Sequence, residues 1–441
     1  MSDSLFAQPF SRRTALQLGL GAAALPFLAS CSGASTSGGG DFTFLSTQFT
    51  PVEEKQRFEK ILADHVKDVK VSYNSMAVGD FTTQVKTQVS AGKVGIGMVG
   101  GLHGDLAPLA DNLEDVSDLA GEMSGAGIPD ELWDLSKLGG GQNKYIPWMQ
   151  ATYVVGVNKA ALEHLPSGAD VNTLTYDQYL DWAIAGRKAT GKPIVGFPAG
   201  SKGLYHRWFQ GFLLPSFTGG LITTFTSPEA VDAWKYMAEL WKNMNPASTN
   251  YDNLQEPMAR GEVLVGWDHV ARLVDAPKDK PDDWVMVPSP TGPKGLGYML
   301  VVAGYGVPKG ADKEKAATVI KALSKPETQL EVLRQNAFFP VVEATVPDDL
   351  PPAVKLESTA VKGTQESPKA IISLPPVGLG AKDGEVSQVF KDCFTQICKE
   401  GADPAKVLPA QAKTLQGILD EAKVPCWAPD PVTAGETCKV V

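Results

Sequence analysis

The sequence predicts an α/β protein, and two observations carry the prediction. From residue 41 onward, short apolar runs alternate with amphipathic stretches at helical spacing. This β-α-β-α order is typical of lobes that are built on a largely parallel sheet. The chain has 441 residues, of which 43% are hydrophobic and 20% are charged, an ordinary composition for a globular protein with two or three cores.

The first elements follow from the period of the apolar residues. Residues 42–47, FTFLST, predict a strand, residues 51–66 a helix with one apolar face, and residues 69–74 a second strand. We expect Asp80 to cap the next helix, FTTQVKTQVSAG, because a carboxylate accepts from the free N–H groups of a first turn. Residues 94–99 predict the third strand.

Later elements are marked by their caps and prolines. Thr175–Gln178 forms a capping box, Ser227 and the following proline begin a helix, and Pro326 separates two further helices. The proline-rich segments DDLPPAVKLE and KAIISLPPVG predict connections, and residues 384–422 predict a closing pair of helices.

The first thirty residues have the character of an export signal. Arg12 and Arg13 precede an apolar run, residues 15–27, that is too short to span a bilayer. The twin arginines resemble a Tat signal, and Sec export is the alternative. We expect this segment to be removed from the mature protein.

The residues that follow predict a lipid anchor. Leu28-Ala29-Ser30-Cys31 resembles a lipobox, in which Cys31 would carry lipid, and the alternative is the end of an ordinary signal. The Gly/Ser-rich residues 32–40 predict a flexible tether. We therefore expect an exported protein anchored to the outer face of the cytoplasmic membrane, or a periplasmic one.

The net charge of the mature chain excludes some classes of binding partner. Cleavage after residue 30 removes Asp3, Arg12 and Arg13 and leaves 38 basic and 49 acidic residues, a net charge of −11. Such a surface repels polyanions, so we expect neither nucleic acid nor an anionic membrane face as a partner.

The cysteines also indicate export. Besides Cys31 there are four, Cys393, Cys398, Cys426 and Cys438, an even number suited to two disulfides in an oxidising compartment. Three pairings are possible. In a helix Cys393 and Cys398 would lie about 7.5 Å apart along the axis, at the limit of a bridge, so we favour pairing each with Cys426 or Cys438. A zinc site is the rival, but no histidine is near.

The stretch KVGIGMVGG contains a G-x-G-x-x-G pattern at Gly95, Gly97 and Gly100. A dinucleotide site requires a strand before the first glycine and a helix at the third. Here a predicted helix precedes the pattern and the glycines fall within a predicted strand, so we do not expect a cofactor. Instead we expect residues 100–103 to form the edge of a ligand cleft.

The order of these features resembles that of the extracellular solute-binding proteins of ABC importers, above all the group that binds sugars and glycerophosphodiesters. The resemblance is carried by the lipoprotein signal, KYIPWMQATYVVGVNKAAL, GEVLVGWDH, AGYGVPKGADKEKAATVIKALSKPETQ and NAFFPVV. It covers nearly all of residues 41–425. The chain departs from the family pattern in the Gly-rich VGIGMVGG, where a Pro-Asp pair is usual, and in its four C-terminal cysteines.

The resemblance implies a two-lobed periplasmic-binding-protein-like fold with hinge strands and a ligand cleft between the lobes. Lobe one would comprise residues 41–148 plus 300–340, and lobe two residues 149–299 plus 341–425, followed by a disulfide-containing tail at 426–441. The resemblance further implies a monomer that binds a small molecule and delivers it to permease subunits in the membrane, without enzymatic activity, cofactor or metal.

Sugars present apolar C–H faces and a rim of hydroxyls, so we expect aromatic rings and fixed polar groups at strand ends. The candidates are Gln48, Phe49, Asp80, Leu102, His103, Trp148, Tyr205, Arg207, Trp208, Trp267, Asp268, Gly297 and Tyr298. Trp267 and Asp268 directly follow the apolar run VLVG, which would place a ring and an acceptor at a strand end. The alternative for the aromatic candidates is the core, and for Asp80 a cap alone.

Catalytic patterns are weak. The chain has no H-E-x-x-H, and its five histidines show no metal-ligand spacing. The segment around Ser201, AGSKG, misses the G-x-S-x-G elbow by its first residue, and we interpret this serine as a helix cap. The sequence therefore favours capture of a sugar or oligosaccharide. The alternatives are a glycerophosphodiester, whose anion Arg207 would help to bind, and an exported hydrolase or oxidoreductase.

Overall fold

The structure is a computed structural model that describes residues 42–50, 52–433 and 435–441. The predicted signal, the predicted lipidation site Cys31 and the predicted tether lie outside the described residues. The chain beyond residue 40 forms one compact unit.

The first sheet has six strands in the order β11-β4-β10-β3-β1-β2. Its strands are β1 (Phe42–Ser46), β2 (Val71–Ser75), β3 (Ile96–Leu102), β4 (Tyr145–Ala151), β10 (Val301–Gly306) and β11 (Phe339–Pro340). Strand β1 pairs in parallel with β2 and β3, whereas β10 is antiparallel to β3 and β4, and β11 is antiparallel to β4. The prediction of a largely parallel sheet was therefore wrong for three of its five strand pairs, because β4, β10 and β11 belong to the segments that pass between the lobes.

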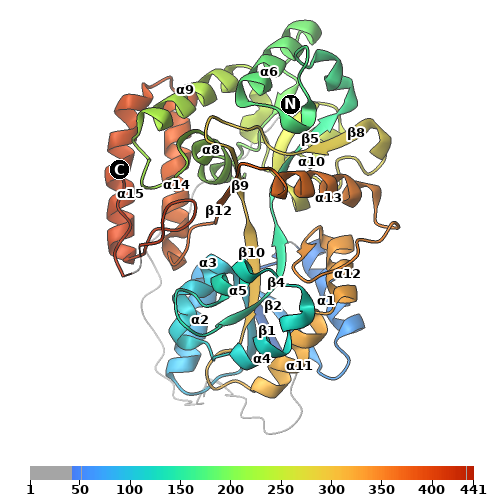
Figure 1. The fold of residues 1–441 in the computed structure, drawn as a ribbon, viewed down its shortest axis with the longest axis vertical. Coiled ribbons are helices and arrows are strands. Elements are labelled where there is room, and N and C mark those ends of the chain that lie inside the picture. The colour runs from blue at the N-terminus through green and yellow to red at the C-terminus, as the bar shows by residue number, and fades with distance from the viewer. Residues whose placement is uncertain (1–41, 51, 434) are drawn as a thin grey trace, which may run out of the picture. The chain divides into compact units, whose positions relative to one another are not determined.

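Helices cover both faces of this sheet (Figure 1). They are α1 (Val52–His65), α2 (Val78–Ser90), α3 (His103–Leu106), α4 (Ser117–Glu122), α5 (Asp130–Ser136), α11 (Lys313–Leu323) and α12 (Pro326–Asn336). Helix α1 buries Phe58, Ile61 and Leu62, the apolar face that the sequence predicted. Helix α2 begins earlier than predicted, with Ala77 at its N-cap and no side-chain cap. Asp80 is therefore a first-turn residue and not the cap.

The second lobe contains a four-stranded sheet in the order β6-β7-β5-β8 and a two-stranded sheet of β12 and β9. The strands are β5 (Tyr153–Asn158), β6 (Val195–Gly196), β7 (Val265–His269), β8 (Trp284–Val287), β9 (Leu296–Met299) and β12 (Ala370–Ser373). Strand β5 is antiparallel to β7 and β8, and the two short pairs β6–β7 and β12–β9 are parallel.

The helices of this lobe are α6 (Tyr176–Thr190), α7 (His206–Trp208), α8 (Leu214–Thr218), α9 (Pro228–Lys242), α10 (Gln255–Ala259), α13 (Pro352–Gln365), α14 (Asp383–Phe394) and α15 (Pro404–Ala422). The predicted caps are confirmed, because Thr175 accepts from the Gln178 N–H in a capping box and Ser227 accepts from the Ala230 N–H. Three expectations were wrong. The segment 369–378, which was expected to be a connection, contains β12, and this strand pairs with β9. Ser201 lies in a turn and caps no helix, since α7 begins only at His206. The expected connection at 348–357 contains the start of α13, because a proline suits a first helical turn.

The two lobes are joined by chain segments that run between their sheets, visible at the centre of Figure 1. One crossing passes from β4 through Thr152 to β5, and another from β9 to β10. The Thr152 hydroxyl donates to the Met299 carbonyl at 2.8 Å and so ties these crossings together. The chain thus has the two-lobed fold that the sequence predicted. The residue limits of the lobes given above remain a proposal.

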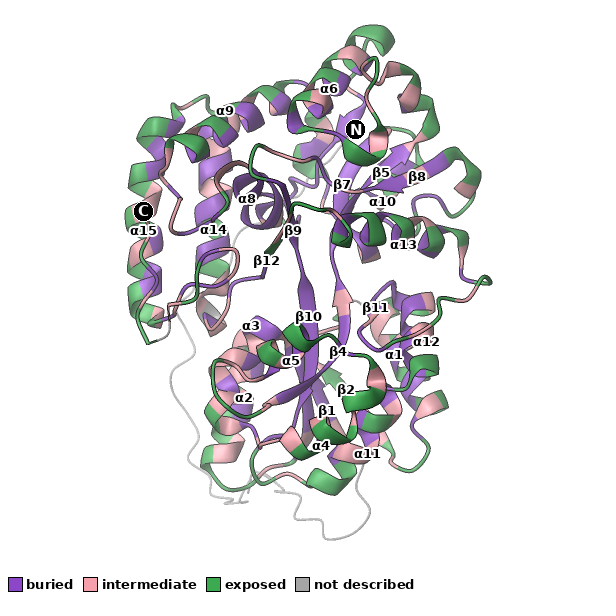
Figure 2. Cartoon of the chain, viewed as in Figure 1, coloured by how far each residue is buried: buried purple, intermediate pink, exposed green. Residues whose placement is uncertain are grey.

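Buried side chains line the strands and the inner faces of the helices, while exposed ones cover the outer faces (Figure 2). At the C-terminal end a disulfide joins Cys426 to Cys438, with 4.5 Å between the Cα atoms. Cys393 and Cys398 are free thiols on α14 and the π-helical turn after it. The favoured cross-pairing was therefore wrong: the last cysteines pair with each other because the chain after α15 turns back on itself, with the Cys438 N–H donating to the Val424 carbonyl.

Candidate ligand-binding site

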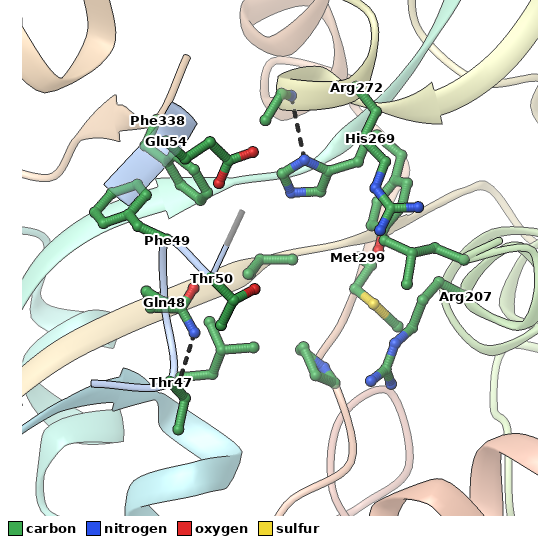
Figure 3. A pocket seen from close by; sticks show the side chains of 16 residues that line it. Thr47, Gln48, Phe49, Thr50, Glu54, Arg207, His269, Arg272, Met299 and Phe338 are labelled. Carbon is green, nitrogen blue, oxygen red and sulfur yellow. Dashed lines mark hydrogen bonds between the residues drawn. The ribbon is translucent and has the colours of Figure 1, made fainter. Parts of the chain in front are cut away.

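A pocket of about 250 Å³ lies where the crossing strands meet the strand ends of both lobes (Figure 3). Its described lining residues are Thr47, Gln48, Phe49, Thr50, Glu54, Leu102, Tyr153, Leu204, Arg207, His269, Ala271, Arg272, Met299, Val301, Phe338 and Pro375. The loop after β1 and the end of β3 contribute one wall. Loops at the carboxyl ends of strands are where an α/β sheet offers a ligand site.

Two phenylalanines form the aromatic side of that wall. Phe49 has a positive φ of 49°, an uncommon conformation for a residue with a side chain. Its ring packs edge-on against Phe338 at 5.3 Å and Trp148 at 6.1 Å, and tilted against Phe58 at 4.7 Å. The surrounding rings therefore hold both the ring and the strained backbone beside the pocket.

The polar part of the same wall is fixed by a buried carboxylate. Asp105 Oδ2 accepts from the Thr47 hydroxyl at 2.7 Å and from the Leu102 N–H at 3.1 Å. Burial raises the pKa of Asp105 to about 6 against these hydrogen bonds. The Gln48 amide in turn donates to Thr47 Oγ1 at 3.0 Å. Three lining residues thus depend on one aspartate behind them.

An aromatic stack forms the floor on the side of the second lobe. Tyr153 lies in register with His269 on the neighbouring strand. Its ring stacks on Trp267 at 4.7 Å and contacts the edge of His269 at 5.0 Å. His269 Nδ1 accepts from the Ala271 N–H at 3.2 Å, so the neutral ring carries its proton on Nε2 and can donate it. Burial and the nearby Arg272 lower the pKa of His269 to about 3, so the ring stays neutral.

Two arginines and one glutamate supply the charges of the pocket. Figure 3 shows Arg207 and Arg272 on one side and Glu54 across from them. Arg207 comes from α7, Arg272 from the short 3-10 turn Val270–Arg272 after β7, and Glu54 from the first turn of α1. Burial raises the pKa of Glu54, and Arg57 and Arg272 oppose the shift.

Four of the predicted site residues line this pocket: Gln48, Phe49, Leu102 and Arg207. They come from three separate parts of the chain that the fold brings together. The other candidates are not among its described lining residues, and their roles in binding remain predictions.

The three predicted tryptophans lie in the core behind the lining. Trp148 stacks on Tyr305 at 4.6 Å, and Trp208 contacts the edge of Trp267 at 5.1 Å. Each of these tryptophans is at most 2% exposed. Tyr205 is also buried, and its ring packs on Phe394 at 5.2 Å.

The remaining candidates have local partners in the structure. His103 Nδ1 is 3.0 Å from the Tyr145 hydroxyl, and burial lowers the pKa of this histidine to about 4. Asp268 accepts from the N–H groups of Leu254 and His269 at 3.0 and 2.8 Å, and burial raises the pKa of Asp268 to about 7.

Gly297 and Tyr298 lie on β9, where the Gly297 N–H donates to the Ser216 hydroxyl at 2.9 Å. Asp80 lies in the first turn of α2.

Sequence reasoning missed several lining residues, above all Tyr153, His269, Arg272, Glu54 and Phe338. A signal existed for His269, because residues two apart on a strand share a face and His269 follows Trp267 by two. Asp268 by the same rule faces the other way. For Glu54 and Phe338 no local signal exists, since a first-turn glutamate and an apolar loop residue are common everywhere.

This arrangement of two lobes around an aromatic and polar pocket defines a solute-binding fold. The sequence matches the family of bacterial extracellular solute-binding proteins over residues 51–330. Because the match covers more than half of the chain, the protein belongs to this family. No curated protein matches the sequence.

Solved structures of the same architecture support the fold. UgpB from Mycobacterium tuberculosis in complex with glycerophosphocholine is 19% identical, with a TM-score of 0.68 over 87% of this chain and 99% of that chain. Maltose-bound MalE3 of T. maritima is 20% identical, with a TM-score of 0.67 over 86% of this chain and 100% of that chain. The GacH receptor of Streptomyces glaucescens, solved unliganded and with acarbose, is 17% identical, with a TM-score of 0.66 over 86% of this chain and 98% of that chain. At such identities the likeness concerns the fold.

Two further observations apply to the described part of the chain. None of its helices is long and apolar enough to cross a membrane. Within the same residues, no group of three histidine, cysteine or acidic side chains is placed to hold a metal ion.

Proposed function

We propose that the protein is the lipid-anchored binding component of an ABC importer, a monomer that captures a sugar or oligosaccharide outside the cytoplasmic membrane and delivers it to a permease. The family membership supports the class of function. The lipobox at Cys31 and the Gly/Ser-rich tether support the anchor. The protein binds and releases its ligand without turning it over, and ATP hydrolysis belongs to a separate subunit.

The observation that carries the choice of a sugar is the pairing of aromatic faces with fixed polar groups. Phe49, Phe338 and Tyr153 line the pocket beside Gln48 and the donor nitrogen of His269. Aromatic faces suit the C–H faces of a sugar ring, and orienting polar groups suit its hydroxyls. Closure of the lobes around the ligand would then signal the loaded state to the permease.

The second candidate ligand is a glycerophosphodiester, and the position of Arg207 favours it. Its guanidinium reaches the pocket on the side opposite Glu54 (Figure 3). A phosphodiester anion could bind this arginine while the aromatic rings contact a choline-like head.

Calorimetric titration of the purified full chain with neutral oligosaccharides and with glycerophosphodiesters tests the proposal. We expect saturable binding of at least one sugar. Phe338→Leu should weaken that binding about 2- to 10-fold, because an aromatic contact contributes about 0.5–1.5 kcal/mol. The control is Phe217→Leu, whose ring packs on Tyr176 and Tyr236 away from the pocket. If none of the sugars binds, the sugar proposal is overturned.

A further inference from the structure

The two walls of the pocket carry opposite kinds of polar group. Arg207 and Arg272 both reach the cavity from the second lobe (Figure 3). A guanidinium donates hydrogen bonds and accepts none. The wall of the first lobe, by contrast, contains the carboxylate of Glu54 and the amide of Gln48.

No carboxylate of the described residues lies within ion-pair distance of Arg272, although its charge acts on Glu54 and Asp268. Its Nη1 donates to two backbone carbonyls, Asp252 at 3.0 Å and Lys202 at 3.4 Å. The side chain is only half-buried, so part of its donor capacity faces the cavity. A cation withdrawn from water is costly without an anion beside it.

Arg207 has one loosely held counter-ion. Its Nη1 donates to Gln210 at 2.8 Å, while its Nη2 lies 3.4 Å from Asp383 Oδ2. The Asp383 side chain is 35% exposed, whereas that of Arg207 is 13% exposed. Arg207 therefore has one partly solvated carboxylate within ion-pair distance, and Arg272 has none among the described residues.

The field of these arginines reaches their neighbours. Both lower the pKa of Tyr153 against the larger effect of burial, which raises it to about 12. Both also oppose protonation of His206, whose pKa burial already lowers. Asp268 and Asp383 act on the pKa of Tyr153 in the opposite direction, so the two arginines lie beside carboxylates, in a chain with a formal net charge of −10.

The hydrogen bonds behind the first-lobe wall determine which atom Gln48 offers. The Thr47 hydroxyl donates its one hydrogen to Asp105, so Thr47 Oγ1 can only accept from Gln48. The Gln48 amide nitrogen is therefore turned toward Thr47, and its carbonyl oxygen is left for a ligand. With the Glu54 carboxylate, this wall offers acceptors to the donors of a ligand.

We propose that the ligand is a hydroxyl-rich solute that carries an oxyanion, a phosphate or a carboxylate, held between Arg207 and Arg272. Its hydroxyl or ammonium donors lie toward Gln48 and Glu54 in the first lobe. Planar guanidinium groups match the geometry of an oxyanion and bind it by paired, charge-assisted hydrogen bonds. This inference rests on the proposed function and narrows the class of its ligand.

The test is calorimetric titration of the full chain with matched pairs that differ in the anionic group. The probes are glucose against glucose 6-phosphate and glucuronate, and glycerol against glycerol 3-phosphate and glycerophosphocholine. We expect the anionic member of a pair to bind at least 10-fold more tightly, and the phosphate and carboxylate arms identify the anion. Tightest binding by a neutral sugar would overturn this inference and leave sugar capture standing. Failure of every probe would overturn this inference, while the titrations with neutral oligosaccharides decide the proposed function separately.

A variant pair assigns the effect to the pocket. Arg272→Gln should weaken the anionic probe about 10- to 100-fold and leave its neutral partner within 2-fold. The control is Arg260→Gln, which removes the same charge from an exposed site that contacts Glu256 and Glu262. Arg207→Gln is the second variant, and circular dichroism checks that each one folds. Equal losses for Arg260→Gln and Arg272→Gln would show a long-range charge effect and refute the assignment.

Discussion

The contact between Gly104 and Pro376 gives a sharp test of how the cleft closes. Gly104 lies on α3 directly after β3, and Pro376 follows β12 in the other lobe. A Cβ at Gly104 would lie 2.2 Å from the Pro376 carbonyl oxygen, where ordinary contacts begin at 3.4 Å. The neighbouring Pro375 lines the pocket, so this approach of two backbones belongs to the edge of the cleft.

The change we propose is Gly104→Ala. The added methyl group must push the two segments apart by about 1 Å, and such overpacking costs about 1–3 kcal/mol. If the segments separate when the lobes open, the cost arises only in the closed state. Ligand affinity should then fall about 5- to 150-fold.

The measurement is calorimetric titration with the tightest probe, together with the melting temperature of the unliganded protein. The control is Gly121→Ala on α4, where a Cβ would meet no atom within 4 Å. We expect weaker binding by Gly104→Ala with little change in its unliganded melting temperature. Affinity within 2-fold of the parent chain would refute the reasoning, and an equal loss of unliganded stability would show that the contact persists when the lobes open.

Two further predictions concern stability. Asp268 has a pKa of about 7 in the folded chain against about 3.9 in the unfolded chain, so the stability that its neutral form contributes is present at low pH and lost as the pH rises through 7. Between pH 5 and 8 the free energy of unfolding of the parent should fall by about 2–3 kcal/mol, a loss that Asp268→Asn should not show. Urea unfolding measures this difference, and parallel pH profiles of the two proteins would contradict the prediction. Opening the disulfide by Cys426→Ala with Cys438→Ala should cost about 3 kcal/mol, since it closes a loop with a sequence separation of 12. Cys398→Ser serves as the control because that thiol is free, and an equal loss from the control would refute the assignment.

Local patterns in the sequence predicted most of the secondary structure. The apolar face of α1, the capping box at Thr175 and the Ser227 cap are short-range features, and the structure has all three. The order of strands in the first sheet could not be predicted from local patterns in the sequence. Strands β4 and β10 join it from the crossing segments, and their direction depends on pairing partners about 150 residues apart in the chain.

The sequence named some lining residues of the pocket that lie near a strand end and missed others that only the fold places there. Gln48 and Phe49 lie two and three residues beyond the end of β1, and the sequence already predicted that strand and its end. Arg272 lies three residues beyond β7, and only the turn after His269 directs it to the pocket. The cysteine pairing failed for a similar reason, since the turn between Cys426 and Cys438 has no regular period.

The predicted tryptophans lie in the layer behind the described lining of the pocket. Trp148 lies behind Phe49, and Trp267 lies behind Tyr153. Neither indole nitrogen has a hydrogen-bond partner among the described residues. A large ring gains most from complete burial, so the tryptophans occupy the layer beneath the pocket while smaller rings reach the surface. In this position Trp148 packs against Phe49 and Trp267 against Tyr153, and direct contact of either tryptophan with a ligand stays a prediction.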